Sequence, residues 1–301
     1  MSPAWAHGSE AVGELVSDFR LEVLLPMLVL AGLYAVGWSR LSRHPFTARR
    51  VMFTLVGFAA LVLALLSPLD ELADRLFVAH MAQHMLLIMV AAPALLLADP
   101  FPVVVWALPH AWRLRIGAWI TRGSTAGRVW RATTSMSLAW IVSASILWGW
   151  HLPSAYDAAF GHRWLHDLEH LSFFLGAILF WWPVIHPAPR YRRGPSYPAR
   201  VVYLVLGAFQ TAALGLLLTL APTTLYRAYA GAAALEDQTR GGIVMWGAGG
   251  AIDMLAVLVV LYVALGSGSS TPPPAADQVR RISKSTQAVD ERSRGVRAPI
   301  V

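Results

Sequence analysis

Seven long apolar segments constrain what this chain can fold into. They lie at roughly 20–38, 50–68, 76–98, 134–150, 165–186, 199–220 and 242–265. A helix needs about 20 apolar residues to cross the hydrocarbon core of a bilayer. The whole chain is 56% hydrophobic and only 14% charged, which is a membrane composition. Because backbone polar groups in lipid must pair within their own segment, we predict an all-α polytopic membrane protein with seven transmembrane helices.

The remaining segments define the expected domain organisation. Residues 1–19 form a short extracytoplasmic N-terminal segment, 20–266 the seven-helix domain, and 267–301 a disordered basic cytoplasmic tail rich in Ser and Pro. No basic residue precedes the first apolar run, so we expect a retained helix and not a cleaved signal peptide. Residues 100–123 mix Pro, Arg and Trp, which favours an interfacial segment.

Basic residues are distributed unequally between the loops. Most of the 24 Lys and Arg lie after the first, third and fifth apolar segments and in the tail. The positive-inside rule then predicts that the N-terminus lies outside and the C-terminus in the cytoplasm. We attribute the net charge of +7 to loops and a tail that lie beside membrane lipid, so it does not indicate a protein that binds nucleic acid.

Two pairs of histidines repeat the same spacing near the outer face. His80 and His84 are four residues apart, as are His166 and His170, and His151 ends the fourth apolar segment. Residues i and i+4 lie one above the other on a helix, so each pair can hold one ion. Polar side chains within a membrane are costly and are by default functional candidates. The five imidazoles therefore predict a metal site.

The available side chains restrict the metal. The chain has no cysteine, which excludes thiolate ligands. Imidazole suits copper and zinc, and thioethers of Met81, Met85 or Met245 would favour Cu(I). Met81 and Met85 lie about a quarter-turn or more from the histidine face and can equally be core residues. Haem is disfavoured, because i, i+4 pairs converge on one small ion.

The stretch "HDLEH" at residues 166–170 supports a rival interpretation. It fits a pattern of zinc proteases in which Glu169 would be the general base. The pattern is short and arises readily by chance. A membrane zinc hydrolase with zinc as its metal is therefore an alternative.

Three further polar residues are candidates for accessory roles. Asp253 lies halfway along the seventh segment and should face the bundle interior, where it could relay a proton or ion. Asp237 and Gln238 lie in "LEDQTRGGIVMW", which we interpret as an outer loop. They are either partners that orient the histidines or exposed loop residues.

Four motifs in order resemble those of the bacterial CtaG family of cytochrome c oxidase assembly factors. They are "HMAQHMLL…AAPALLLADP", "WGWHLPSAYDAA", "HDLEHLSFFLGAILFWWPV" and "DQTRGGIVMW". The likeness covers about residues 20–265, and the ordered set is specific where each motif alone is weak. This seven-helix family is linked to caa-type oxidases.

The resemblance implies a function in the biogenesis of a haem-copper oxidase. Copper would pass from an extracytoplasmic donor, through His80, His84, His151, His166 and His170, to the oxidase catalytic subunit. The family likeness gives Asp237, Gln238 and Met245 no assigned role. A copper transporter that uses Asp253 and Met245 as a path inward is one alternative, and a structural scaffold for oxidase subunits is another.

Overall fold

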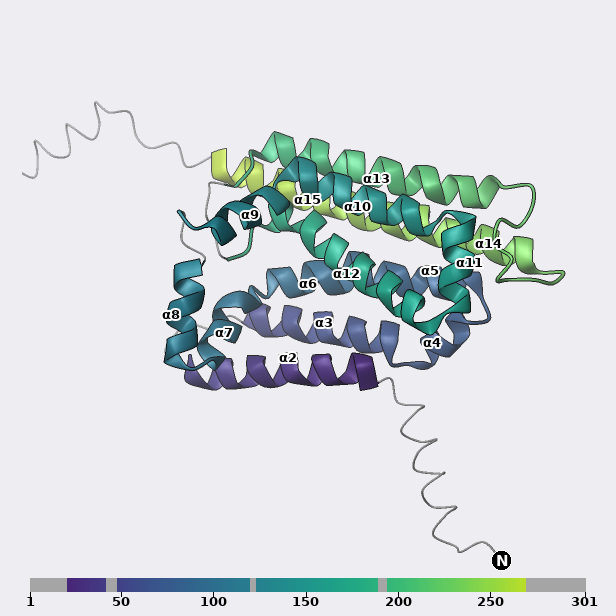
Figure 1. Cartoon of the computed structure of the whole chain (residues 1–301). Coiled ribbons are helices and arrows are strands. Elements are labelled where there is room, and N and C mark those ends of the chain that lie inside the picture. The colour runs from purple at the N-terminus through teal and green to yellow at the C-terminus, as the bar shows by residue number, and fades with distance from the viewer. Residues whose placement is uncertain (1–20, 42–47, 120–122, 189–193, 269–301) are drawn as a thin grey trace, which may run out of the picture. The chain divides into compact units, whose positions relative to one another are not determined.

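The computed structural model describes residues 21–41, 48–119, 123–188 and 194–268 (Figure 1). The expected N-terminal segment 1–19 and, beyond its first two residues, the expected tail 267–301 lie outside the described residues. The chain divides into two compact units, Met1–Leu258 and Val259–Val301, and everything described below about packing concerns the first.

Every regular element in the described residues is helical. In chain order the elements are α2 (Leu21–Arg40), α3 (Ala48–Leu65), α4 (Pro68–Ala73), α5 (Phe77–Met85), η1 (Leu86–Ala91), α6 (Ala92–Leu97), α7 (Pro100–Ala107), α8 (His110–Trp119), α9 (Thr125–Thr133), α10 (Met136–Trp150), α11 (Pro153–Gly161), α12 (Arg163–Ile185), α13 (Tyr197–Leu220), α14 (Ala234–Ile243), η2 (Val244–Ala248) and α15 (Gly249–Gly268). The all-α class predicted from the apolar runs is confirmed.

Six helical stretches in the described residues are long and apolar enough to cross a membrane. They are Val23–Arg40, Ala48–Leu65, Phe77–Leu97, Arg163–Ile185, Tyr197–Leu220 and Ala234–Gly266. The predicted span at 134–150 forms a shorter apolar helix, α10. Large apolar side chains such as Phe209 and Leu220 are more than 70% exposed, as expected where lipid is the solvent. The chain is a multi-pass membrane protein by these criteria.

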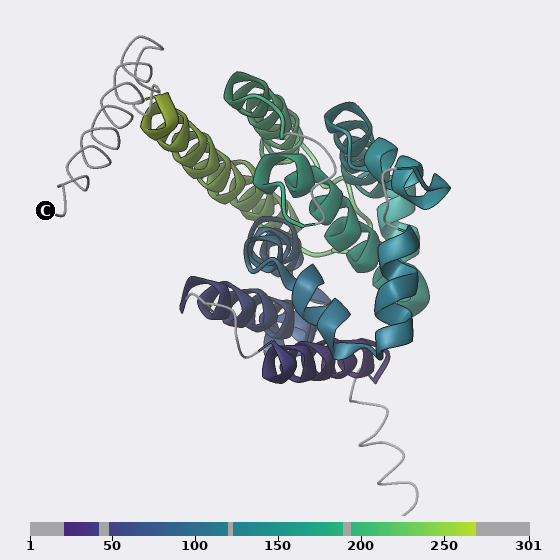
Figure 2. The same cartoon turned by 90° about the vertical axis from the view of Figure 1, so that its left-hand side faces the viewer.

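The helix from Phe77 to Leu97, made of α5, η1 and α6, is the most deeply buried of the spans. It packs against α3, α4, α12 and α14 (Figures 1 and 2). Leu87 and Ala91 of η1 pack into an apolar cluster with Ala60, Leu61 and Ala64 of α3. Side chains that point from this helix toward α12 are therefore far from lipid.

A π-helical segment, η1, interrupts the central helix directly after Met85. Pro93 follows it and has no backbone N–H, and its ring would clash with the carbonyl four residues earlier in a regular α-helix. The wider turn of the π-helix changes the backbone hydrogen bonds, so that Ala92 N–H bonds to Leu87 O. The Ile88 carbonyl accepts instead from Trp181 Nε1 at 3.0 Å. The π-segment thus sets the face on which the preceding turns display their side chains.

The seventh span begins earlier than predicted. Ala234–Ile243, interpreted above as an outer loop, is the helix α14, which continues through η2 into α15. Glu236 and Asp237 lie in its first turn, where the helix dipole favours negative charge. Glycines within it, which weaken a helix by propensity, lie at close tertiary contacts that local sequence does not reveal.

Close contact between α13 and α14 requires two of these glycines. A Cβ on Gly242 would come within 2.6 Å of the Gly215 carbonyl oxygen, and a Cβ on Gly215 would come within 2.9 Å of the Gly242 carbonyl oxygen. Small residues at helix crossings are a general device of membrane bundles. Here they let α14 approach the rest of the bundle.

We expect Gly242→Ala to lower the free energy of unfolding by about 1–3 kcal/mol, because the added methyl group meets backbone atoms that cannot move aside. Thermal unfolding of the purified protein in detergent measures the loss. Gly250→Ala is the control, since nothing lies within 4 Å of its Cβ position. Equal melting temperatures for both variants would contradict the packing described.

Candidate metal centre

The first turns of the central helix present two imidazoles toward α12. His80 and His84 lie on one face of α5 and are 2% and 1% exposed. Their ring centroids are 4.3 Å apart. In α12 the rings of His166 and His170 lie at the same separation, 4.3 Å. The i, i+4 spacing thus places the two rings of each pair next to each other, as the sequence predicted.

The two pairs face each other across the α5–α12 contact. The His80 ring centroid lies 5.2 Å from that of His166, and the His84 centroid lies 5.2 Å from that of His170. Glu169 of α12 is 1% exposed. Its Oε1 is 3.7 Å from His84 Nε2 and 3.9 Å from His80 Nε2. These separations are too long for hydrogen bonds.

Two overlapping groups of these residues could hold a metal ion. One is His80, His84 and His170, and the other is His80, His166 and Glu169; within each, the ligand atoms lie within 4.8 Å of one another. Nitrogens around a tetrahedral ion at about 2.0 Å bond length are roughly 3.3 Å apart, so small side-chain shifts would close either group. His80 belongs to both groups and can serve only one ion at a time.

Unpaired ring nitrogens support a cation in this position. His84 Nδ1 and Nε2, and His80 Nε2, are buried without a hydrogen bond. A buried polar atom that lacks a partner costs about 1–3 kcal/mol. A neutral imidazole has one lone pair, so coordination of an ion would satisfy one of these nitrogens on each ring.

His151 lies at the edge of the cluster. It follows the last residue of α10, and its ring centroid is 6.5 Å from that of His84. It belongs to neither ligand group. Its Nδ1 lies 2.8 Å from the Leu147 carbonyl oxygen, to which it donates, so that Nε2 is left as the acceptor nitrogen. The residue can join a bound ion only after a movement toward His84.

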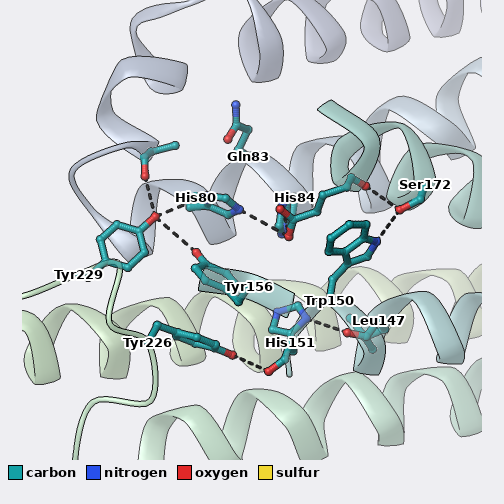
Figure 3. Close-up of polar contacts among 12 residues, drawn as sticks. His80, Gln83, His84, Leu147, Trp150, His151, Tyr156, Ser172, Tyr226 and Tyr229 are labelled. Atoms are coloured by element: carbon teal, nitrogen blue, oxygen red, sulfur yellow. Dashed lines mark hydrogen bonds and ion pairs between the residues drawn. The ribbon is translucent and has the colours of Figure 1, made fainter. Parts of the chain in front are cut away.

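Three tyrosines, which sequence reasoning missed, lie on one side of the cluster (Figure 3). The Tyr229 hydroxyl donates to the Ala73 carbonyl at 2.7 Å, which leaves its oxygen to accept from His80 Nδ1 at 3.4 Å. Tyr156 donates to Tyr229 at 3.3 Å. Burial raises the pKa of the Tyr229 hydroxyl above its ordinary value, so it stays protonated at neutral pH. The network orients His80 with Nε2 toward the cluster.

Tyr226 belongs to the same network. Its hydroxyl donates to the His151 carbonyl at 3.1 Å, and its ring centroid is 4.1 Å from that of Tyr156. Only Tyr156 lies in a motif that attracted attention in the sequence. Residues 226 and 229 are far from the histidines along the chain and carry no spacing signal.

Asp237 and Gln238 stabilise the elements around the cluster. Asp237 accepts from the backbone N–H groups of Phe77 at 2.6 Å and Val78 at 3.2 Å, and so caps α5 from another helix. Gln238 accepts from Leu225 N–H at 2.7 Å and donates to the Leu218 carbonyl. Neither contacts an imidazole through these bonds.

Two of the three candidate sulfur ligands, Met81 and Met85, pack against the last span. Met81, Met85 and Met245 are all buried. A Cβ on Gly241 of α14 would lie 3.1 Å from Met81 Cγ, and one on Gly249 of α15 would lie 3.5 Å from Met85 Sδ. Met81 and Met85 thus pack against the last span, as their offset from the histidine row suggested.

We expect Asp237→Ala to destabilise the protein by about 0.5–2 kcal/mol, because the first N–H groups of α5 lose their acceptor. Chemical or thermal unfolding in detergent measures this. Glu236→Ala is the matched control: its ion pair with Arg240 is exposed and contributes little. A larger effect at Glu236 than at Asp237 would contradict the capping role.

Comparison with known proteins shows the family to which the chain belongs. Uncharacterized proteins of Mycobacterium bovis and Mycobacterium tuberculosis are each 26% identical to it over 280 residues, which cover 88% of this chain. The chain spans only 41% of the length of these relatives. No solved structure matches. The family described as cytochrome c oxidase caa3 assembly factor matches residues 32–266, and the chain therefore belongs to this family.

Proposed function

We propose that this protein binds copper in the buried imidazole cluster and delivers it to the catalytic copper centre of a haem-copper cytochrome c oxidase. The family assigns the chain to oxidase assembly. The observation that carries the copper proposal is the group of His80, His84 and His170, which offers three imidazoles and no thiolate. In this proposal the protein is an assembly factor and not an enzyme.

The overlap of the two ligand groups supports a transfer role. An ion held by His80, His84 and His170 can pass to His80, His166 and Glu169 by exchange of two ligands, while His80 stays bound. Imidazole and carboxylate ligands hold Cu(I) less tightly than thiolates do, so the ion can leave for a histidine site of similar affinity. His151 would complete the coordination after moving inward.

The proposed partners follow from this chemistry. The recipient is the catalytic subunit of the oxidase, and the source is an extracytoplasmic copper donor. We place the protein in the bacterial plasma membrane with seven spans, α10 being the fourth, the N-terminus outside and the C-terminus in the cytoplasm. The cluster then lies near the outer face, with residues 267–301 as a cytoplasmic tail.

A copper transporter is the second candidate function. Asp253, a buried carboxylate in the last span, favours it because it could carry an ion beyond the cluster. Copper uptake into sealed vesicles separates the two functions, since a chaperone binds copper without moving it across the bilayer.

We expect His84→Ala and His170→Ala each to lose copper. Loss of a residue that only hydrogen-bonds to a metal ligand lowers metal affinity by roughly 10–100-fold. Loss of a ligand itself should lower the copper affinity by at least as much. Metal analysis of the purified protein and of the oxidase from the same cells measures both steps. His162→Ala is the control, because His162 is exposed and its Nδ1 bonds only to the Ala158 carbonyl. Unchanged copper in both cluster variants would overturn the proposal.

The orientation has its own test, for which the absence of native cysteine is an advantage. We expect Thr223→Cys, an exposed position after α13, to react with a membrane-impermeant maleimide in intact cells. Gly123→Cys, exposed before α9, should react only after lysis. The reverse pattern would invert the topology.

A further inference from the structure

A small cavity lies one side-chain layer from the imidazole cluster, on its inner side. Its volume is about 50 Å³, which holds one or two water molecules or a single dehydrated ion. Phe173 lines it and also contacts the cluster, with its ring centroid 4.5 Å from that of His84. Leu147, whose carbonyl accepts from His151, lines it as well. Phe173 and Leu147 thus separate the cavity from the cluster.

Two buried oxygen atoms in residues that line the cavity accept no hydrogen bond. Asp253 Oδ1 and Gln210 Oε1 are buried without a hydrogen-bond partner. Thr211 and Ser143 also line the cavity, but their hydroxyl groups donate to helix carbonyls, those of Gly207 at 3.2 Å and Ala139 at 2.8 Å. The carboxylate therefore meets oxygen acceptors and no hydroxyl donor from its neighbours.

Asp253 also lacks a charged partner among the residues that the structure describes. It is 2% exposed in the interior of the bundle. An unpaired carboxylate in the middle of a membrane helix is costly and is found mainly where a partner or an ion compensates it. A cation in the adjoining space would neutralise the charge and satisfy the acceptors together.

The side chains of two methionines also line the cavity. Met85 and Met89 both face the cavity. A Cβ on Gly249 would lie 3.5 Å from Met85 Sδ and 3.8 Å from Met89 Cε, and Asp253 follows Gly249 by one turn on the same face of α15. The methionines of the central helix and the carboxylate of α15 therefore line the same cavity. Thioethers select soft ions, of which Cu(I) is the physiological case.

We propose that this cavity is a second cation site, in which Met85, Met89 and Asp253 bind a soft monovalent ion, Cu(I) or its surrogate Ag(I). The site is separate from the imidazole cluster and does not depend on delivery to an oxidase. A monovalent ion leaves the pair with the carboxylate electrically neutral, which suits a dry position within the bundle. Phe173 is the barrier that an ion would pass between the two sites.

X-ray absorption of the 301-residue chain loaded with Cu(I) under reducing conditions tests the site without any substitution. The chain has no cysteine, so any sulfur in the copper coordination sphere must come from methionine. We expect both copper–sulfur and copper–nitrogen scattering and a stoichiometry above that of the cluster alone. Scattering from nitrogen and oxygen only would overturn the proposal and would leave a proton as the counter-charge of Asp253.

Variants assign the sulfur signal. The double substitution Met85→Leu with Met89→Leu conserves volume and should remove copper–sulfur scattering and one equivalent of Cu(I) or Ag(I). Asp253→Asn should weaken the same equivalent by at least about tenfold, the loss expected when a metal site loses a supporting group. Met254→Leu, next to Asp253 but 60% exposed, is the control and should bind as the wild type does.

His84→Ala separates this inference from the proposed function. It should lose the nitrogen-ligated ion and keep the sulfur-ligated one, so either site can fail without the other. A sulfur signal that persists in the double methionine variant would place the thioether ligands elsewhere and would overturn the assignment.

Discussion

The desolvated imidazoles on the central helix are the constraint on which the rest of the structure depends. His80 and His84 lie on the most deeply packed span, where water cannot pair their ring nitrogens. Such groups are costly unless each finds a partner. His80 Nδ1 donates to the Tyr229 hydroxyl oxygen and His151 Nδ1 donates to the Leu147 carbonyl, so the Nε2 atom of each ring is left with its lone pair. The remaining lone pairs face one another, which is an arrangement that a cation stabilises and that an apolar core would not retain.

The helices around the cluster are held in place by polar groups at long sequence separation. The Asp237 carboxylate caps α5 from α14, and Trp181 donates to a carbonyl at the π-segment. Gln83, which lies between the two histidines in the sequence of α5 and is fully buried, donates to Ala64 O at 2.6 Å and to Asp70 Oδ1 at 2.7 Å. Each bond replaces a solvent contact that the membrane interior does not supply. The result is a rigid frame around a site whose own ligand atoms are only partly paired.

Much of the fold could be predicted because hydrophobic length and helical period are local properties. The predicted span 76–98 corresponds to Phe77–Leu97, and the i, i+4 histidine pairs face each other as expected. Two features could not be predicted from local sequence. The helix at Ala234–Ile243 contains Gly241 and Gly242, whose value is a close approach to Phe77 and to α13. The tyrosines of the loop before α14 approach the cluster only because the chain folds back over it.

By itself, the sequence determined the all-α class, the candidate membrane spans, the absence of cysteine and the residue types of the candidate metal centre. These follow from composition and from spacing within one helix. Only the tertiary structure showed which imidazoles lie close enough to share an ion, that His151 lies outside both ligand groups, and that Asp237 caps the N-terminus of α5. It also joined Asp253 with Met85 and Met89 around one cavity. The physical reason is that coordination and desolvation depend on distances between helices, and those distances are set by packing across the whole bundle.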